Sequence, residues 1–289
     1  MTFEYVRPNS LGEAFRLLTE YGPKAKILAG GTDLLLAIRM GKATPRYLID
    51  LSRLAELHGI WATDTGITIG AMTKVREIEI SSLLVKDYRI LVEAASTLAS
   101  VQIRHLATIG GNICNASPSA DLVPALLVLD AQAEIAGPYG RRTIPLVDFF
   151  QGPRQSVLKP TEVLVKLHVP CPAVRSGAVY IKHSLRRAMD LAFIGVANLV
   201  SATNGAPDTI RIALGAVAPT PIRARQAEEL VLGRGNLNPE TIAEAARMAA
   251  DEAKPIDDVR SSAWYRRRMV EVDTKRALTE AAKIMEERS

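Results

Sequence analysis

The sequence has few of the side chains that metal centres and disulfide frameworks require. Its 289 residues include two cysteines and four histidines, and no two histidines are spaced as His-x-x-x-His. A disulfide framework, a four-thiolate iron–sulfur cluster and a structural zinc site each need more such residues. The sequence therefore predicts no metal site within this chain.

Aromatic residues and long apolar runs are scarce as well. Aromatic residues make up 5% of the chain, too few for a base-stacking platform. The net charge of +5 and the run Arg266-Arg267-Arg268 are interpreted as a solvated basic surface rather than a nucleic-acid site. No segment approaches the roughly eighteen unbroken apolar residues of a membrane span, and residues 1–8 hold no apolar signal stretch. We therefore expect a soluble, cytoplasmic protein.

The fingerprints of common nucleotide and hydrolase sites are also absent. The sequence contains no Gly-x-Gly-x-x-Gly and no Gly-x-Ser-x-Gly. Gly41-Lys42 is not a P-loop, because Leu36 stands where that motif needs its first glycine. A Rossmann site, a P-loop and the simplest hydrolase are thus not supported.

What is present is an ordinary globular composition, 48% hydrophobic and 23% charged, in a chain long enough for two domains. Periodicity and caps predict helices over residues 10–21, 33–40, 71–100 and 122–129. Strands are expected over residues 26–28, 47–50, 58–61, 67–69, 133–136, 141–144 and 162–169.

The pattern changes at Pro170-Cys171-Pro172, where we place a domain boundary. Three antiparallel strands are expected beyond it, over residues 178–183, 193–202 and 209–217, and an Asn204-Gly205 turn joins the last two. Helices follow from residues 226, 239 and 261. The predicted fold class is α+β, with a mixed domain over residues 1–172 and a small antiparallel sheet plus helices over residues 173–289.

Two segments carry adjacent glycines followed by a small polar residue, Gly30-Gly31-Thr32 and Gly110-Gly111-Asn112. Glycine pairs allow positive φ and bring backbone N–H groups close to an anion. The first pair also precedes a helix, whose N-terminus favours negative charge. The two loops together suit the two phosphates of a dinucleotide, although a glycine pair by itself is a common tight turn.

Two further features have both a structural and a functional interpretation. Asp121 stands before a helix, where it is either an N-cap or an acceptor for sugar hydroxyls. Lys182, Arg186, Arg187 and Asp190 form either a solvated turn or a cationic edge that would stabilise an anionic reduced flavin.

Taken together, the segments 29–35 and 108–113 resemble the two diphosphate-binding motifs of the FAD subunit in the xanthine dehydrogenase and carbon monoxide dehydrogenase family. The segments 116–124, 182–190 and 262–266 resemble further parts of the same subunits, so the similarity spans nearly the whole chain. The resemblance implies a PCMH-type FAD-binding domain of two α/β lobes, with FAD bound non-covalently between it and the C-terminal domain.

The resemblance also implies the residues that contact FAD. The diphosphate would lie against residues 29–33, Gly110, Gly111 and Asn112, and Asp121 would bind a sugar hydroxyl. Leu98, Leu164, Lys182 and Leu191 would line the flavin. The neighbouring motif positions Leu28, Ala29, Thr32, Asp33, Leu34, Ala107, Thr108, Asn115 and Ser117 complete the expected cofactor-binding set.

The family's activity implies an electron relay without a catalytic residue in this chain. Substrate would be oxidised at a molybdopterin centre in a large subunit, and electrons would reach the flavin through 2Fe-2S clusters of a small subunit, in a dimer of heterotrimers. Thr32-Asp33 replaces the His-Ser of the carbon monoxide enzymes, which favours a xanthine-type or aromatic hydroxylase. With two cysteines, the chain lacks the 4Fe-4S loop of the 4-hydroxybenzoyl-CoA reductase subunit.

Two alternatives remain open at this stage. One is a self-contained flavin oxidase or dehydrogenase with its own base and a covalently attached flavin. The other is a nucleotide-binding module without redox activity. The sequence names neither the substrate nor the final electron acceptor.

Overall fold

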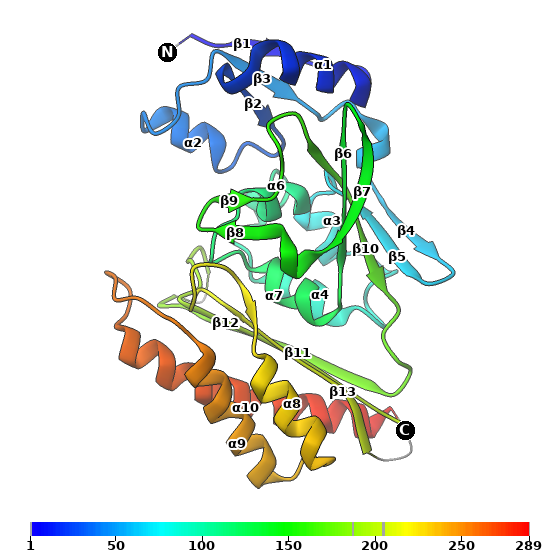
Figure 1. The fold of residues 1–289 in the computed structure, drawn as a ribbon, viewed down its shortest axis with the longest axis vertical. Coiled ribbons are helices and arrows are strands. Elements are labelled where there is room, and N and C mark those ends of the chain that lie inside the picture. The colour runs from blue at the N-terminus through cyan, green and yellow to red at the C-terminus, as the bar shows by residue number, and fades with distance from the viewer. Residues whose placement is uncertain (1, 187, 204–205, 289) are drawn as a thin grey trace.

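The three larger sheets follow one another along the long axis of the molecule, from the N-terminal lobe at the top to the C-terminal helices at the bottom (Figure 1). The structure is a computed structural model that describes residues 2–186, 188–203 and 206–288. The first two sheets with their helices form the two lobes of the N-terminal half, and the third sheet carries the C-terminal helices. The predicted α+β class is confirmed.

The first lobe is built on a parallel sheet of order β1-β3-β2, with β1 at Glu4–Val6, β2 at Ala25–Leu28 and β3 at Tyr47–Asp50. Helix α1 (Leu11–Tyr21) begins at Ser10, whose side chain accepts from the amide of Glu13, and buries one apolar face. Helix α2 (Leu34–Arg39) follows the first glycine pair. The short helices η1 (Gly22–Lys24) and η2 (Ala55–Leu57) complete the connections. The sequence predicted α1, β2, α2 and β3 but missed β1.

The second lobe holds an antiparallel sheet of order β4-β5-β10-β6-β7. Its strands are β4 (Ile60–Thr63), β5 (Gly66–Gly70), β6 (Gln132–Gly137), β7 (Gly140–Pro145) and β10 (Val163–Pro170). Between β7 and β10 lie η3 (Leu146–Phe149), β8 (Phe150–Gly152) and β9 (Gln155–Ser156). The helices of this lobe are α3 (Val75–Glu79), α4 (Arg89–Ser96), α5 (Val101–Arg104), α6 (Ile109–Cys114) and α7 (Leu122–Val128).

The prediction of helix throughout residues 71–100 is wrong in three stretches, residues 71–74, 80–88 and 97–100. Lys74 forms an antiparallel bridge with Thr108, and the amide of Val75 donates to the carbonyl of Ala107, so the chain before α3 is extended. Turns separate α3 from α4 over residues 80–88. Pairing with a segment some thirty residues away overrides the local helical periodicity, which was correct only for α3 and α4.

The third sheet has the antiparallel order β11-β12-β13-β14, from β11 (Ser176–His183), β12 (Ile194–Thr203), β13 (Ala206–Gly215) and β14 (Ile222–Arg223). The three expected strands are present, and the two-residue β14 is a fourth that the sequence did not predict. The expected Asn204-Gly205 turn lies outside the described residues. Helices α8 (Arg225–Arg234), α9 (Pro239–Glu252) and α10 (Ala263–Glu287) cover the lower face in Figure 1.

The hydrophobic cores extend across the boundaries between these layers. The largest core fills the space under the five-stranded sheet and includes Tyr180, Ala197, Leu199 and Ala213 from the third sheet. A second core lies between the other face of the third sheet and α8–α10. Helix α7 is buried between the second and third sheets, and α4 packs beside it against α7 and β11 while Arg89 and Ser96 of that helix remain exposed (Figure 1).

The close packing of β11 on α10 gives a test of the fold. A Cβ atom at Gly177 would lie 1.9 Å from the carbonyl oxygen of Ala281, so Gly177→Ala must separate the strand from the helix. We expect a loss of ~2–3 kcal/mol in the free energy of unfolding, the usual cost of overpacking. Gly233→Ala is the matched control, since no atom lies within 4 Å of that Cβ position in α8. Chemical denaturation checks this, and equal effects of the two substitutions would contradict the packing described.

Candidate functional site

The first glycine pair lies in the loop between β2 and α2. Gly31 has a φ of +73°, a conformation that glycine adopts without strain. Gly30 has no room for a side chain, because a Cβ there would lie 2.2 Å from the carbonyl oxygen of Leu106 and 2.9 Å from the Cα of Ala107. One glycine therefore turns the chain and the other permits contact with the second lobe.

The backbone N–H groups of this loop are free. In the part of the chain that the structure describes, the amides of Gly30, Gly31, Thr32 and Asp33 donate no hydrogen bond. Asp33 stands at the N-cap of α2, but its side chain caps no amide. These four residues are half buried or exposed, so their amides are accessible to a ligand, and four consecutive N–H groups without a protein partner are suited to an anionic oxygen.

The second glycine pair is helical, which the sequence analysis did not predict. Thr108 is the N-cap of α6 and its hydroxyl accepts from the amide of Gly111 at 3.0 Å. The amides of Ile109 and Gly110 donate to the carbonyls of Thr73 and Ala71, and that of Asn112 to Thr108. The expectation that this loop offers free amides is wrong for these four groups, because they anchor α6 to the lobe.

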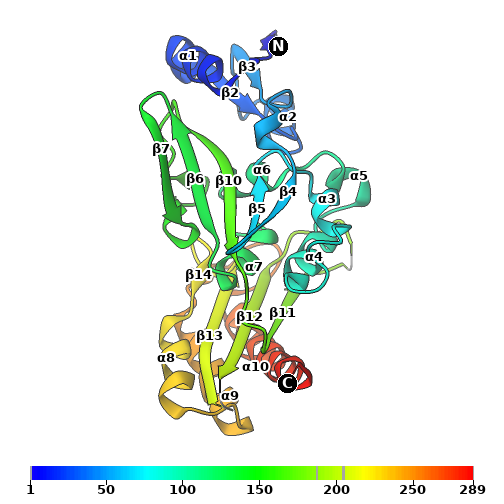
Figure 2. The ribbon, with the colours of Figure 1, turned by 90° about the vertical axis from the view of Figure 1, so that its right-hand side faces the viewer.

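Gly110 still has a steric role. A Cβ at this position would lie 2.6 Å from the carbonyl oxygen of Ala71, so only glycine lets α6 approach that strand end so closely. Gly111 faces the first loop, with its Cβ position 3.8 Å from the Cβ of Ala29. The two glycine segments, eighty residues apart in the sequence, therefore lie side by side. Figures 1 and 2 both place α6 directly below the first lobe.

Asn112 supplies a polar group that lacks a partner. Its Oδ1 atom is buried and accepts no hydrogen bond from any described residue. A buried, unsatisfied amide oxygen costs free energy unless a ligand or water supplies a donor. This atom and the free amides of the first loop are the features that a dinucleotide cofactor would satisfy, with hydroxyl or N–H groups for Asn112 and phosphate oxygens for the amides. The residues present fit such a group.

Asp121, Tyr180 and Lys182 form a second cluster, at the meeting of the second and third sheets. The Lys182 ammonium lies 3.0 and 3.1 Å from the two carboxylate oxygens of Asp121 and donates to the carbonyl of Thr97 at 2.9 Å. The Tyr180 hydroxyl donates to Asp121 at 3.3 Å. Asp121 occupies the N-cap position of α7 but makes no capping hydrogen bond. Asp121 is therefore at the predicted N-cap position, but its side chain binds Lys182 and Tyr180 instead of capping the helix.

Burial dominates the electrostatics of this cluster. Fewer than a tenth of the Asp121 and Lys182 side-chain surfaces are exposed. Burial raises the pKa of the Asp121 carboxyl to about 6, although Lys182 and Tyr180 act to lower it. Burial also raises the pKa of Tyr180 above its ordinary value, and the adjacent carboxylate adds to that rise. The cluster therefore holds a carboxyl whose pKa is raised toward neutral pH and that is hydrogen-bonded to Lys182 and Tyr180.

The other predicted site residues lie beside the glycine segments, after α6, or in the core nearby. Leu28, Leu34 and Ala107 flank the glycine segments, and Asn115 and Ser117 follow α6. Leu98 is buried next to Thr97, and Arg104 holds its carbonyl at 2.8 Å. Leu164 is buried in the core and precedes Val165, whose carbonyl accepts from Ala71 behind the second glycine pair.

The basic turn after β11 is separated from Lys182. Arg186 is exposed and its backbone amide donates to Asp190 at 3.0 Å, with their side chains 3.8 Å apart. Leu191 is half exposed beside them. Arg187 lies outside the described residues. Lys182 is thus buried against Asp121, whereas Arg186 is paired at the surface.

Sequence reasoning missed Tyr180 and Thr97. Tyr180 lies two residues before Lys182 in β11, and alternation along a strand would have placed both on one face. Thr97 contributes only a backbone carbonyl, which carries no sequence signal.

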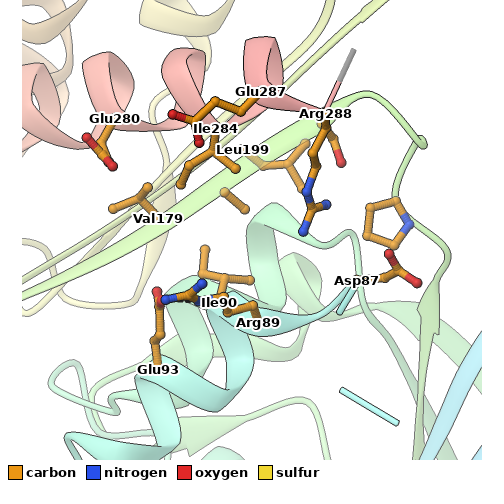
Figure 3. A pocket seen from close by; sticks show the side chains of 13 residues that line it. Asp87, Arg89, Ile90, Glu93, Val179, Leu199, Glu280, Ile284, Glu287 and Arg288 are labelled. Carbon is orange, nitrogen blue, oxygen red and sulfur yellow. Dashed lines mark hydrogen bonds and ion pairs between the residues drawn. The ribbon is translucent and has the colours of Figure 1, made fainter. Parts of the chain in front are cut away.

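A cavity of about 530 Å³ opens between α4 and the layer of β11 and α10, and none of the predicted cofactor residues lines it. Figure 3 shows Glu280 and Glu287 of α10 across from Arg89 and Glu93 of α4. Among the described residues, no group of three histidine, cysteine, aspartate or glutamate side chains is arranged to hold a metal ion. No described helix is long and apolar enough to cross a membrane.

Comparisons with known proteins cover nearly the whole chain. The family described as "FAD binding domain in molybdopterin dehydrogenase" matches residues 1–172, and "CO dehydrogenase flavoprotein C-terminal domain" matches residues 179–281. The xanthine dehydrogenase FAD-binding subunit of Escherichia coli O157:H7 is 36% identical over 279 residues, 96% of this chain and 95% of that protein. The carbon monoxide dehydrogenase medium chain of Hydrogenophaga pseudoflava is 37% identical over 279 residues, 96% of either chain.

Solved structures agree with these matches. A carbon monoxide dehydrogenase from Hydrogenophaga pseudoflava, which lacks the Mo-pyranopterin moiety of its cofactor, superposes with a TM-score of 0.95 at 37% identity over 98% of either chain. The quinoline 2-oxidoreductase of Pseudomonas putida 86 gives a TM-score of 0.91 at 28% identity, again over 98% of either chain.

The buried carboxyl generates a prediction about pH. In the unfolded chain Asp121 titrates near 3.8, and in the folded protein near 6, so the folded state holds the proton more tightly. The stability that this proton contributes is fully present below pH 3.8 and is lost as the pH rises through about 6. The unfolding free energy of the wild type relative to Asp121→Asn should therefore fall by up to ~3 kcal/mol as the pH rises across this window. Asp64→Asn, in an exposed turn, controls for the substitution, and a difference independent of pH would contradict the assignment.

Proposed function

Because this chain belongs to the family of FAD-binding medium subunits of the xanthine dehydrogenase and carbon monoxide dehydrogenase type, we propose that it holds FAD non-covalently as the electron-transfer subunit of a molybdenum hydroxylase. When bound, FAD supplies a group that takes up electrons singly and releases them as a pair. The observation that carries the proposal is the row of free amides at residues 30–33, packed against the second glycine pair.

We place the diphosphate against the first loop because its amides are free. The N–H groups of Gly30, Gly31, Thr32 and Asp33 bind its oxygens, with Ala29 as the contact to α6. The second segment contributes side chains instead: Asn112 supplies its unpaired amide oxygen, with Asn115 and Ser117 next along the chain. Gly110 and Gly111 then act by close approach rather than by donating hydrogen bonds.

The buried cluster suits the sugar and flavin end of the cofactor. We propose that Asp121 accepts from a sugar hydroxyl while Lys182 balances its charge, and that Leu98 and Leu191 line the ring system. Leu164 supports this surface from the core rather than forming it, because only 3% of its surface is exposed. The domain boundary proposed with this arrangement divides the chain into residues 1–172 and 173–289.

The chain needs partners to act as an enzyme. Because the chain belongs to a family of FAD-binding subunits of larger enzymes, we assign substrate oxidation to another subunit. We propose a molybdopterin-binding large subunit and a small subunit with 2Fe-2S clusters, assembled as a dimer of heterotrimers. Electrons then pass from the clusters to the flavin and on to an external acceptor.

A self-contained oxidase with a covalently attached flavin is less consistent with the site. Cys114 lies in α6 two residues after Asn112, but burial raises the pKa of its thiol to about 12. A thiol of this kind is not ionised near neutral pH and is a poor nucleophile. The cysteine nearest the glycine segments is therefore unsuited to a bond with a flavin.

The visible spectrum of the protein purified from its host tests the cofactor. We expect a flavin band near 450 nm that acid treatment releases into the supernatant, because no covalent bond holds FAD. Asn112→Ala should weaken FAD retention by about fivefold, the contribution of roughly one hydrogen bond. Asn9→Ala, at an exposed residue of the first lobe, is the matched control. A colourless protein that ignores added FAD would sink the proposal.

We propose a xanthine-type or aromatic hydroxylase rather than a carbon monoxide enzyme, because Thr32 and Asp33 of the first loop stand in place of the His-Ser of the carbon monoxide enzymes. We expect the native complex to reduce a dye with a purine or another nitrogen heterocycle at a rate at least ~100-fold above that with carbon monoxide, a difference that active-site selection readily produces. Steady-state assays with both substrates measure the ratio. Dye reduction by carbon monoxide at a comparable rate would contradict this assignment.

A further inference from the structure

Helix α7 belongs to the N-terminal domain and packs against the sheet of the C-terminal domain. Every residue from Leu122 to Val128 is buried. Pro124 fits into a hollow formed by two glycines that pair across β12 and β13, with the Cβ position of Gly215 only 2.9 Å and that of Gly195 3.7 Å from its Cγ. The helix therefore rests directly on the third sheet, without intervening side chains at that point.

The C-terminal end of α7 is held by two arginines of the C-terminal domain. Arg211 of β13 donates to the carbonyl of Val128 at 3.2 Å and to Asp130 at 3.1 Å. Arg223 of β14 donates to the carbonyl of Leu127 at 3.3 Å. The last carbonyls of a helix have no partner within it, and cations are favourable at this end. Arg211 thus satisfies a carbonyl that the helix leaves open, whereas Arg223 adds a second donor to the carbonyl of Leu127, which also accepts from the amide of Asp130 at 3.2 Å.

Arg223 is itself fixed by a buried carboxylate. Its guanidinium makes a two-bond contact with Glu228 of α8, one of the bonds at 2.8 Å, and both side chains are 5% exposed. Glu228 also accepts from the backbone amide of Ile212 at 2.8 Å. A paired, planar guanidinium of this kind has one geometry, so the carbonyl of Leu127 meets a rigid donor.

The N-terminal end of α7 is held from the same domain by different residues. Asp121 precedes the helix, and Lys182 and Tyr180 of β11 bind its carboxylate. With a rise of 1.5 Å per residue, the two ends lie about 10 Å apart. Because a helical backbone does not compress, displacement at one end moves the other.

We propose that Arg211 and Arg223 are positioning residues of the cofactor site: by fixing the C-terminal end of α7 they fix the Asp121 carboxylate against Lys182. The inference rests on the proposed function in one respect, namely that Asp121 faces bound FAD. The arginines touch neither cluster of predicted cofactor residues, and their effect passes through the helix alone.

A substitution that only weakens folding must be distinguished from one that moves Asp121. Arg142 provides the comparison, because it also donates to a carbonyl, that of Val157 at 3.1 Å, and to a carboxylate, Glu162 at 2.8 Å. It lies in β7, away from α7, with 38% of its side chain exposed against 26% for Arg211. Arg211→Gln and Arg142→Gln therefore remove the same kinds of contact from different places.

The experiment measures three quantities on the full chain with whatever subunits it retains: the melting temperature, the affinity for FAD, and the titration midpoint of the Asp121 carboxyl by ¹³C NMR without FAD. Arg211→Gln and Arg142→Gln should lower the melting temperature similarly. Only Arg211→Gln should shift the Asp121 midpoint and weaken FAD binding by about fivefold, the size of roughly one hydrogen bond. Arg211→Lys, which keeps a charged donor, should restore part of both effects.

The second arginine is tested by Arg223→Met combined with Glu228→Gln, which leaves no unpaired buried charge and keeps an acceptor for Ile212. It should shift the Asp121 midpoint in the same way. The proposal is overturned if these variants leave the midpoint where Arg142→Gln leaves it. A wild-type protein that binds no FAD would defeat the proposed function instead, while the titration would still decide the positioning role.

Discussion

The buried contact between Asp121 and Lys182 is the constraint on which the arrangement of the molecule depends. Lys182 lies in β11 and connects this strand to two helices. It binds Asp121, which precedes α7, and the carbonyl of Thr97, which follows α4. Removing one partner of such a buried pair typically costs ~3–5 kcal/mol, whereas a well-packed apolar pair in its place is often neutral. The pair therefore contributes less to net stability than to the choice of one relative position for the two domains.

Contacts within the N-terminal domain determine what each glycine pair can do. Gly30 and Gly31 turn the chain and leave four amides free, while Gly110 and Gly111 lie in a helix whose first amides are already bound to Ala71, Thr73 and Thr108. The two motifs look equivalent as sequence but differ as chemistry. One presents donors to a ligand, and the other allows α6 to approach both the ligand loop and the strand end behind it.

The local structure was largely predictable, and the exceptions have physical causes. Ser10, the hairpin signals and the apolar stripe of α10 specify α1, the β-hairpins and the last helix through contacts within a few residues. The predictions of a helix over residues 71–74 and of a loop over residues 108–112 were wrong. These two segments form hydrogen bonds with each other, which neighbouring residues in the sequence do not reveal. The spacing of apolar residues that predicts a helix contains no information about a hydrogen-bonding segment more than thirty residues away.

By itself, the sequence determined the fold class, the order of the two domains and the family, because periodicity, turn residues and two motifs in order are properties of short segments. Only the tertiary structure decided which amides are free, that Asp121 binds Lys182 instead of capping α7, and that Arg211 and Arg223 hold the far end of that helix. These are contacts between residues some sixty to a hundred positions apart, and the distance between such residues is fixed only when the sheets pack.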